Sequence, residues 1–116
     1  MEYNLENRTL QFSKDIRKFF KKFQIKLINE NIVRQVLRSS TSIGANYCEA
    51  NGAVSKPDFK QKIYICKKEA KETLYWLDLL KEVADISYEN DLKKLTDESN
   101  ELTLIFSKIT SSLKSN

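Results

Sequence analysis

Two carboxylates stand three positions apart in a lysine-rich stretch, and they are the first candidates for chemistry in this sequence. Glu69 and Glu72 occur among Lys67, Lys68 and Lys71. Paired carboxylates can act as general acid and base, but residues three or four apart also share a helix face, where opposite charges form ion pairs. The mixture of signs predicts ion pairs within one helix, and acid–base chemistry is the alternative.

Histidine is absent from the 116 residues, and this removes most catalytic and metal-binding arrangements. No Ser-His-Asp or Cys-His nucleophile can form, and a di-iron bundle in its usual form requires a Glu-x-x-His motif. Cys48 and Cys66 lie outside any CxxC spacing, so we interpret both as reduced thiols of the core or of an interface. Two glycines are too few for a glycine-rich phosphate loop. We therefore expect no metal, no cofactor and no enzymatic activity.

A polar series interrupts the apolar pattern between residues 33 and 51. Ser42, Asn46 and Glu49 follow at intervals of four and three, which places them on one side of a helix, and Ser39 precedes them. These side chains either face solvent or form a hydrogen-bonded network against the next helix or a neighbouring subunit, because buried polar groups require partners.

Three aromatic residues mark the following segment as a candidate interface. Tyr64 and Tyr75 are eleven positions apart, close to three helical turns, and therefore share a face. Trp76 lies between that face and the apolar stripe. Exposed aromatic side chains favour a subunit interface because they bury a large area at small entropic cost. An ordinary core or boundary position and stacking on nucleic-acid bases are the alternatives.

Four segments with helical apolar periodicity must position these residues. The sequence predicts helices over about residues 9–27, 31–51, 56–84 and 88–113. Three short connections between four long helices predict an all-α fold, an antiparallel up-down-up-down four-helix bundle formed by a single domain of residues 1–116.

The helix ends are also marked. The apolar stripe of the first helix is taken to run from Leu10 to Leu27. Candidate N-caps of the three later helices are Asn29 or Asn31, Ser55, and Ser87. Gly52 stands where a glycine would end the second helix.

Basic charge is concentrated near the beginning of the chain. Residues 8–38 carry nine basic and two acidic residues, whereas the whole chain has a formal net charge of +4. The candidate contacts for phosphate or for an acidic partner are Lys14, Arg17, Lys18, Lys21 and Lys22. A solvated helix face is the alternative interpretation.

No apolar run approaches the roughly 20 residues of a membrane-spanning helix. The start, MEYNLENRTL, lacks a basic stretch followed by an apolar one, so we expect no signal peptide. The sequence therefore predicts a cytoplasmic protein without a membrane partner.

The stretch RSSTSIGANYCEANGAVSKPDFKQKIYICKKEAKETLYWLDLL, residues 38–80, resembles a known family. The family comprises bacterial four-helix bundle proteins encoded by intervening sequences within 23S rRNA genes. The residues that carry the resemblance are Ser42, Ile43, Asn46 and Glu49, the Ser55 loop, Asp58 and Phe59, and the run from Lys68, Glu69 and Ala70 through Glu72 and Thr73 to Tyr75, Trp76 and Leu77. Tyr47 and Cys48 depart from the small or aliphatic residues common at their positions.

The resemblance implies an antiparallel bundle that assembles as a ring-shaped homopentamer and has no established enzymatic activity. A related group accompanies the reverse transcriptase of diversity-generating retroelements. We therefore expect a non-catalytic homo-oligomeric scaffold that binds structured RNA or a ribonucleoprotein through its basic face. The alternative is a protein-interaction module that recruits a partner enzyme, such as a retroelement reverse transcriptase, without binding nucleic acid directly. The expected subunit interface comprises Ser42, Asn46, Glu49, Tyr64, Tyr75 and Trp76.

Overall fold

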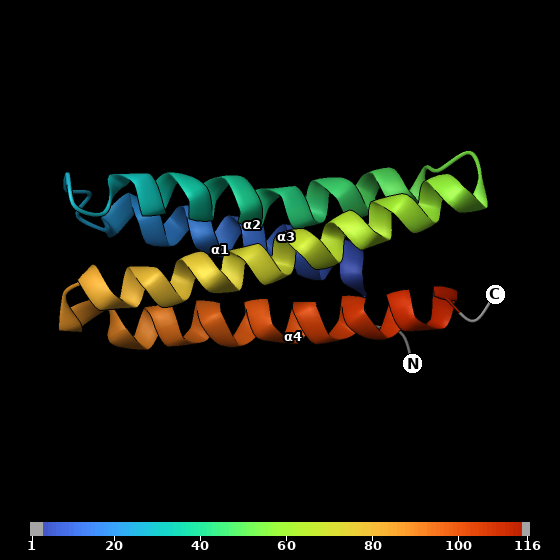
Figure 1. Cartoon of the computed structure of the whole chain (residues 1–116). Helices are drawn as coiled ribbons and strands as arrows, with labels where there is room; N and C mark the ends of the chain where they lie inside the picture. The colour runs from blue at the N-terminus through green and yellow to red at the C-terminus, as the bar shows by residue number, and fades with distance from the viewer. Residues whose placement is uncertain (1–3, 115–116) are drawn as a thin grey trace.

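The chain folds into four long helices packed side by side (Figure 1). The structure is a computed structural model that describes residues 4–114; residues 1–3, on which part of the signal-peptide prediction rests, and residues 115–116 lie outside this range. The helices are α1 (Leu5–Lys22), α2 (Glu30–Asn51), α3 (Lys56–Val83) and α4 (Glu89–Lys114), and a short 3₁₀ turn, η1 (Ile86–Tyr88), precedes α4. Successive helices are antiparallel, and residues 4–114 contain no strand, which confirms the predicted all-α bundle.

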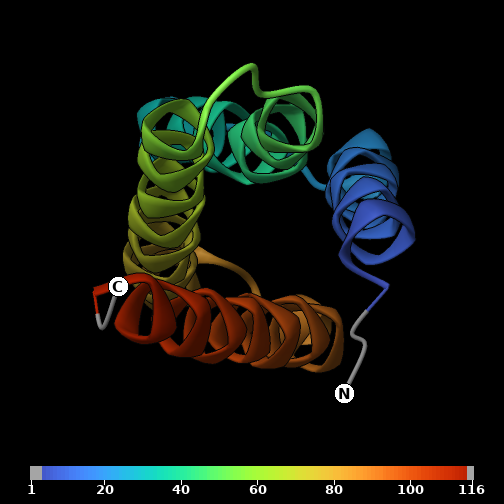
Figure 2. The same cartoon turned by 90° about the vertical axis from the view of Figure 1, so that its right-hand side faces the viewer.

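The four helices surround one core, with α1 diagonal to α3 and α2 diagonal to α4 (Figure 2). The bundle measures 46 × 21 × 21 Å along its principal axes. Helix α3 packs extensively on both α2 and α4, whereas α1 packs mainly on α2 and touches α4 much less. The seam between α1 and α4 is therefore the least closely packed side of the molecule.

The limits of α1 differ from the prediction of about 9–27. The helix begins at Leu5 and ends at Lys22, and Phe23 is extended, with φ −78° and ψ 132°. Leu10 and Leu27, taken as the ends of the apolar stripe, are exposed instead, and Leu5 and Thr9 are buried. The buried positions are spaced by four and three from Leu5 onward. Because the second of them is the polar residue Thr9, the apolar pattern did not reveal that the helix begins at Leu5.

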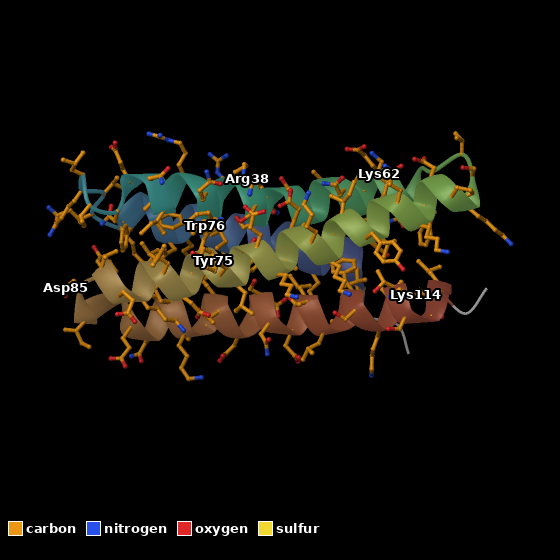
Figure 3. The ribbon with its side chains drawn as sticks, viewed as in Figure 1. Arg38, Lys62, Tyr75, Trp76, Asp85 and Lys114 are labelled. Atoms are coloured by element: carbon orange, nitrogen blue, oxygen red, sulfur yellow. The ribbon has the colours of Figure 1, made fainter. Side chains whose placement is uncertain are left out.

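Side-chain caps set two of the later boundaries. The backbone N–H of Asp58 donates to Ser55 Oγ at 3.2 Å, which confirms the predicted cap of α3. At the α3–α4 connection the capping side chain is Asp85, which Figure 3 labels. Its Oδ1 accepts from the backbone N–H of Ser87, so the prediction of Ser87 as the cap is wrong. Asn29 occupies the N-cap position of α2, but its Oδ1 accepts from Lys26 N, inside the preceding loop.

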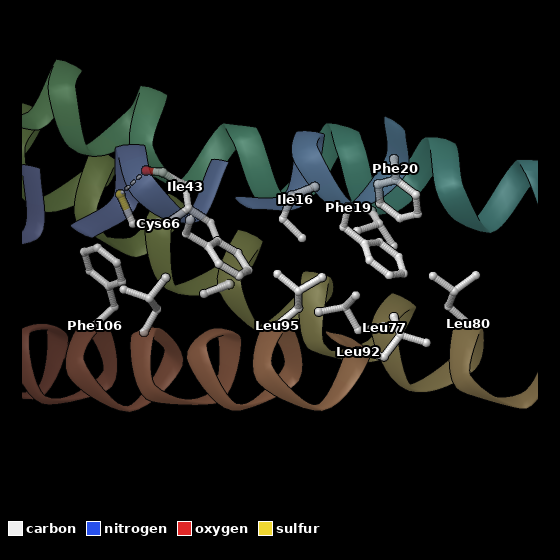
Figure 4. Packing of buried hydrophobic residues seen from close by; sticks show 14 of the residues in the cluster. Ile16, Phe19, Phe20, Ile43, Cys66, Leu77, Leu80, Leu92, Leu95 and Phe106 are labelled. Atoms are coloured by element: carbon white, nitrogen blue, oxygen red, sulfur yellow. Dashed lines mark hydrogen bonds between the residues drawn. The ribbon is translucent and has the colours of Figure 1, made fainter. Parts of the chain in front are cut away.

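The core runs the length of the bundle and contains apolar side chains from all four helices (Figure 4). Its largest fully buried members are Phe12, Ile16, Val36, Ile43, Ile63, Leu77, Leu80, Leu92, Leu102 and Phe106. Polar core residues bond to neighbouring helices. Ser99 of α4 donates to Ala70 O of α3 at 3.0 Å, and Thr73 Oγ1 of α3 lies 2.8 Å from Ser39 Oγ of α2. Within residues 4–114 no buried side-chain nitrogen or oxygen lacks a hydrogen bond, as expected of a well-packed interior.

Candidate functional site

The predicted basic residues form one exposed face of α1. Lys14, Lys18 and Lys21 are four and three positions apart and point away from the core, with Arg17 and Lys22 beside them. We call these five residues the α1 basic face. Lys22 forms an ion pair with Asp91 of α4 at 2.9 Å. The other four have no carboxylate partner among residues 4–114, so their charge is available to an external ligand.

The seam beside this face is joined by charged side chains. Arg8 of α1 donates twice to the Glu98 carboxylate of α4, through Nε and Nη2, each at 2.8 Å. The hydrogen bond to Glu98 raises the pKa of Arg8. Between Arg8 and Lys22 the seam opens into a groove of about 330 Å³ with Phe12, Phe19 and Leu95 at its apolar floor and charged residues at its rim: Asp15, Lys18, Lys22, Asp91, Lys94 and Glu98. The rim is balanced in charge, so the anion-attracting surface is the outer face of α1.

Arg34 of α2 is an exposed cation at the same level of the bundle as the α1 basic face, and it was not among the predicted site residues. A Cβ atom built on Gly44 would lie 3.2 Å from Thr9 Oγ1, so this contact sets the register of the two helices. Arg34 precedes Gly44 by ten residues, and Phe19 follows Thr9 by ten, so the antiparallel packing brings Arg34 level with the basic face. Arg34 is exposed and unpaired among residues 4–114. The charge pattern alone could not reveal this, because it does not fix the register.

The polar series of α2 lies along the side of the helix that faces α3. Ser42 Oγ donates to Arg38 O at 2.7 Å, and Asn46 Nδ2 donates to Ser42 O at 2.8 Å, so both half-buried side chains bond within their own helix. Glu49 reaches α3 and pairs with Lys62 at 2.9 Å. The network predicted against α3 is therefore confined to Glu49 and to buried Ser39.

The structure brings together two of the three predicted aromatic residues (Figure 3). The rings of Tyr75 and Trp76 meet edge to face with centroids 5.0 Å apart. Tyr75 is 61% exposed, whereas Trp76 is half-buried and packs against the core. Tyr64 is half-buried on the same face of α3, three turns away. Tyr75 is thus the aromatic side chain on this face with the largest surface available to a partner.

Arg38 of α2 bonds to the two carboxylates for which ion pairs within one helix were predicted. It bonds to both Glu69 and Glu72 of α3, and Trp76 Nε1 donates to Glu72 Oε2 at 3.0 Å. The prediction of ion pairs within α3 is therefore wrong, because both carboxylates bond to Arg38 of α2. Lys68 lowers the pKa of Glu72 by its charge alone. The pKa of Glu72 is lowered by the Trp76 hydrogen bond first and by Arg38 next, against the effect of burial.

The arrangement offers no evident catalytic centre among the described residues. Within residues 4–114 no three His, Cys, Asp or Glu side chains are grouped as metal ligands. Cys48 is exposed and Cys66 is buried, where desolvation raises the pKa of the Cys66 thiol to about 12. Cys66 Sγ lies 3.5 Å from Ile43 O. None of the helices in the described part of the chain is long and apolar enough to span a bilayer.

Comparisons with known proteins agree with this architecture. The model of the 23S rRNA-intervening sequence protein family matches residues 2–108. A crystal structure of a protein of unknown function from the S23 ribosomal protein family, from Bacteroides thetaiotaomicron VPI-5482, is 35% identical and superposes with a TM-score of 0.73. The match covers 90% of this chain and 96% of that one. None of the curated proteins compared with the chain matches it.

Proposed function

Because the chain belongs to the 23S rRNA-intervening sequence protein family, we propose that it is a non-catalytic scaffold that binds structured RNA or a ribonucleoprotein through the α1 basic face. The proposed scaffold is a homo-oligomer in the cytoplasm, a pentamer as the resemblance implies. The family description names no enzymatic activity, and the related crystal structure is described as of unknown function.

The observation that carries the RNA proposal is the set of unpaired cations on α1. Lys14, Arg17, Lys18 and Lys21 are exposed, and Arg34 of α2 lies at the same level. Phosphate groups are the ligands that such a row attracts without reading a base sequence. The net charge of one chain is a modest +4. An oligomer repeats the same row of cations in every subunit, so the positive electrostatic potentials of the rows add.

Self-association is supported by the outer face of α3. Tyr75 exposes most of its ring beside the half-buried Trp76, and Leu79 follows on the next turn. Aromatic anchors flanked by partly exposed apolar side chains are typical of subunit contacts. This face lies diagonally across the bundle from α1, so an α3 contact leaves the basic face open to RNA.

The test is binding to a labelled structured RNA at several salt concentrations. We compare the wild type with a triple variant, Lys14→Gln, Lys18→Gln and Lys21→Gln, and leave Lys22 unchanged so that Asp91 keeps its partner. Each phosphate contact contributes roughly one unit to the slope of log affinity against log salt, so the slope of the variant should be smaller by about 2–3.

The matched control removes the same charge elsewhere, through Lys56→Gln, Lys71→Gln and Lys108→Gln, all exposed on α3 or α4. We expect this control to keep most of the wild-type salt slope. Equal slopes for both triple variants would contradict a localised RNA face. Weak binding by every form at low salt would favour the alternative, a module whose basic face meets an acidic surface of a partner enzyme.

A further inference from the structure

One end of the bundle carries two chain connections that lie side by side. The α1–α2 connection spans residues 23–29, and the α3–α4 connection spans residues 84–88 (Figure 1). The Tyr88 hydroxyl joins them, because it accepts from Gln24 N at 3.1 Å and donates to Lys22 O at 3.2 Å. The two connections therefore form one continuous end surface.

This end surface is unusually apolar. Half of the large hydrophobic side chains that residues 4–114 expose gather there: Ile25, Leu27, Ile28, Val83 and Ile86. Leu27 and Ile86 are 89% and 78% exposed. We call these five residues the loop-end patch. A concentration of exposed apolar side chains at one end of a bundle is typical of an interaction site.

The charges around the patch are divided between its two halves. The α1–α2 half carries Lys21 and Lys26, which have no ion-pair partner among residues 4–114, and one acid, Glu30 at the start of α2, so its net charge is positive. The α3–α4 half carries Glu82, Asp85 and Glu89, and Lys81 beside them is paired with Asp78 at 3.6 Å. Lys26 lies close enough to lower the pKa of Asp85, after the stronger effect of the Ser87 backbone N–H. One half of the patch is thus basic and apolar, and the other is acidic and apolar.

We propose that the loop-end patch docks a second copy of this chain end to end. A two-fold axis perpendicular to the bundle places the basic half of each copy on the acidic half of the other, so that both apolar halves are covered and both charge pairs are made twice. An RNA or an anionic lipid surface suits this patch less well, because the acidic half repels it. The mixed charge selects a partner that carries the same two halves.

The area that the contact can bury determines its expected affinity. The cross-section of the bundle is 21 × 21 Å, so end-to-end docking buries about 440 Å² per partner, or about 900 Å² in total, at the low end for specific interfaces. We therefore expect a reversible contact whose population rises with protein concentration. The contact is independent of the α3 face: it doubles the mass of whatever assembly the sides of the bundle form.

The experiment measures mass by sedimentation or light scattering from roughly 1 μM to 1 mM, the range in which weak contacts titrate. The variant is Leu27→Ser with Ile86→Ser, two exposed positions whose change leaves the core intact. The control is Val54→Ser, 95% exposed at the opposite end. We expect the wild type and the control to double in mass, and the variant to stay at half that mass. A wild type that never doubles, or a variant that doubles equally, overturns the proposal.

A charge reversal tests the pairing itself. Lys21→Glu with Lys26→Glu makes both halves acidic and should prevent the doubling. Glu82→Lys with Glu89→Lys, added to these two changes, makes the α3–α4 half basic, restores opposite signs and should recover the doubling. Loss without recovery overturns the two-fold pairing. Binding of the wild type to phosphatidylserine vesicles without any doubling of mass would assign the patch to a membrane surface instead. The mass measurement uses no RNA and no α1 triple variant, so loss of RNA binding in that variant does not affect its outcome, and the two proposals fail separately.

Discussion

At the scale of single residues, Arg38 gives a structural explanation for side chains whose spacing resembles a catalytic pair. Glu69 is almost fully buried, and the guanidinium of Arg38 supplies its counter-charge from α2. Glu72 meets the same guanidinium and also accepts the indole N–H of Trp76. The carboxylates therefore fix α2 against α3 and hold the Trp76 ring in place beside Tyr75.

This cluster predicts how stability depends on pH. The pKa of Glu72 lies below its ordinary value, so its contribution to folding is present at neutral pH and is lost as the pH falls through that lowered pKa. Between about pH 6 and 3.5 the free energy of unfolding should fall less steeply in Glu72→Gln than in the wild type, by up to about 1 kcal/mol. Urea unfolding at several pH values measures it.

The control for the pH series is Glu82→Gln, an exposed carboxylate without an ion-pair partner among residues 4–114. Its stability should follow the wild-type pH dependence. If Glu72→Gln also follows the wild type, the Arg38 and Trp76 contacts do not favour the charged carboxylate in solution.

At the scale of elements, the sequence was sufficient for the number, order and approximate limits of the helices, because apolar spacing reports directly on burial. The predicted end of the first helix, at about residue 27, is wrong, because α1 ends at Lys22. Ile25, Leu27 and Ile28 continue an apolar composition beyond Phe23, where the backbone has already turned. Apolar composition indicates a helix only when the side chains are buried, and here they are exposed. The cross-helix pairing of Arg38 was equally inaccessible, since it depends on the register of α2 against α3.

The α1–α2 pair offers a second prediction, at Gly44. Helix propensity alone favours Gly44→Ala by about 1 kcal/mol. The added Cβ would lie 3.2 Å from Thr9 Oγ1 and 3.3 Å from Thr9 Cβ, and Thr9 is buried with its hydroxyl bonded to Leu5 O. Helix α1 must therefore move outward, at a cost of roughly 1–3 kcal/mol. We expect a net loss of about 1 kcal/mol in the free energy of unfolding.

Chemical denaturation measures this change, and Gly52→Ala is its control. A Cβ at Gly52 would meet only Glu49 O, at 3.8 Å, and the φ of −99° suits any residue. The control should change stability by less than about 0.5 kcal/mol. Stabilisation by Gly44→Ala would mean that α1 adjusts without loss of packing.

At the scale of the whole molecule, the diagonal placement of α1 and α3 puts the proposed RNA face and the proposed subunit contact on opposite sides of the bundle. A ring of five copies cannot use one self-complementary contact, so two different faces of each subunit must meet. If the α3 face with Tyr75 meets the α2 or α4 side of the next copy, every α1 basic face remains exposed. Assembly and RNA binding are then compatible, and a single substitution can separate them.

Tyr75→Ser provides that separation. The Tyr75 ring is 61% exposed and contacts only the Trp76 ring among the aromatic side chains of residues 4–114, so the bundle should keep its fold. A central aromatic anchor contributes about 2 kcal/mol to an interface, and its loss should raise the concentration at which half of the subunits assemble by more than tenfold. Mass photometry and light scattering over a dilution series measure this midpoint.

Leu10→Ser is the matched control, since Leu10 is similarly exposed, at 53%, but lies on α1. It should assemble as the wild type does. The α1 cations are unchanged in Tyr75→Ser, so its monomer should bind RNA with the affinity of a single subunit. The additional affinity that comes from several basic faces in one assembly should be lost. An unaltered assembly midpoint in Tyr75→Ser would place the subunit contact on another face of the bundle.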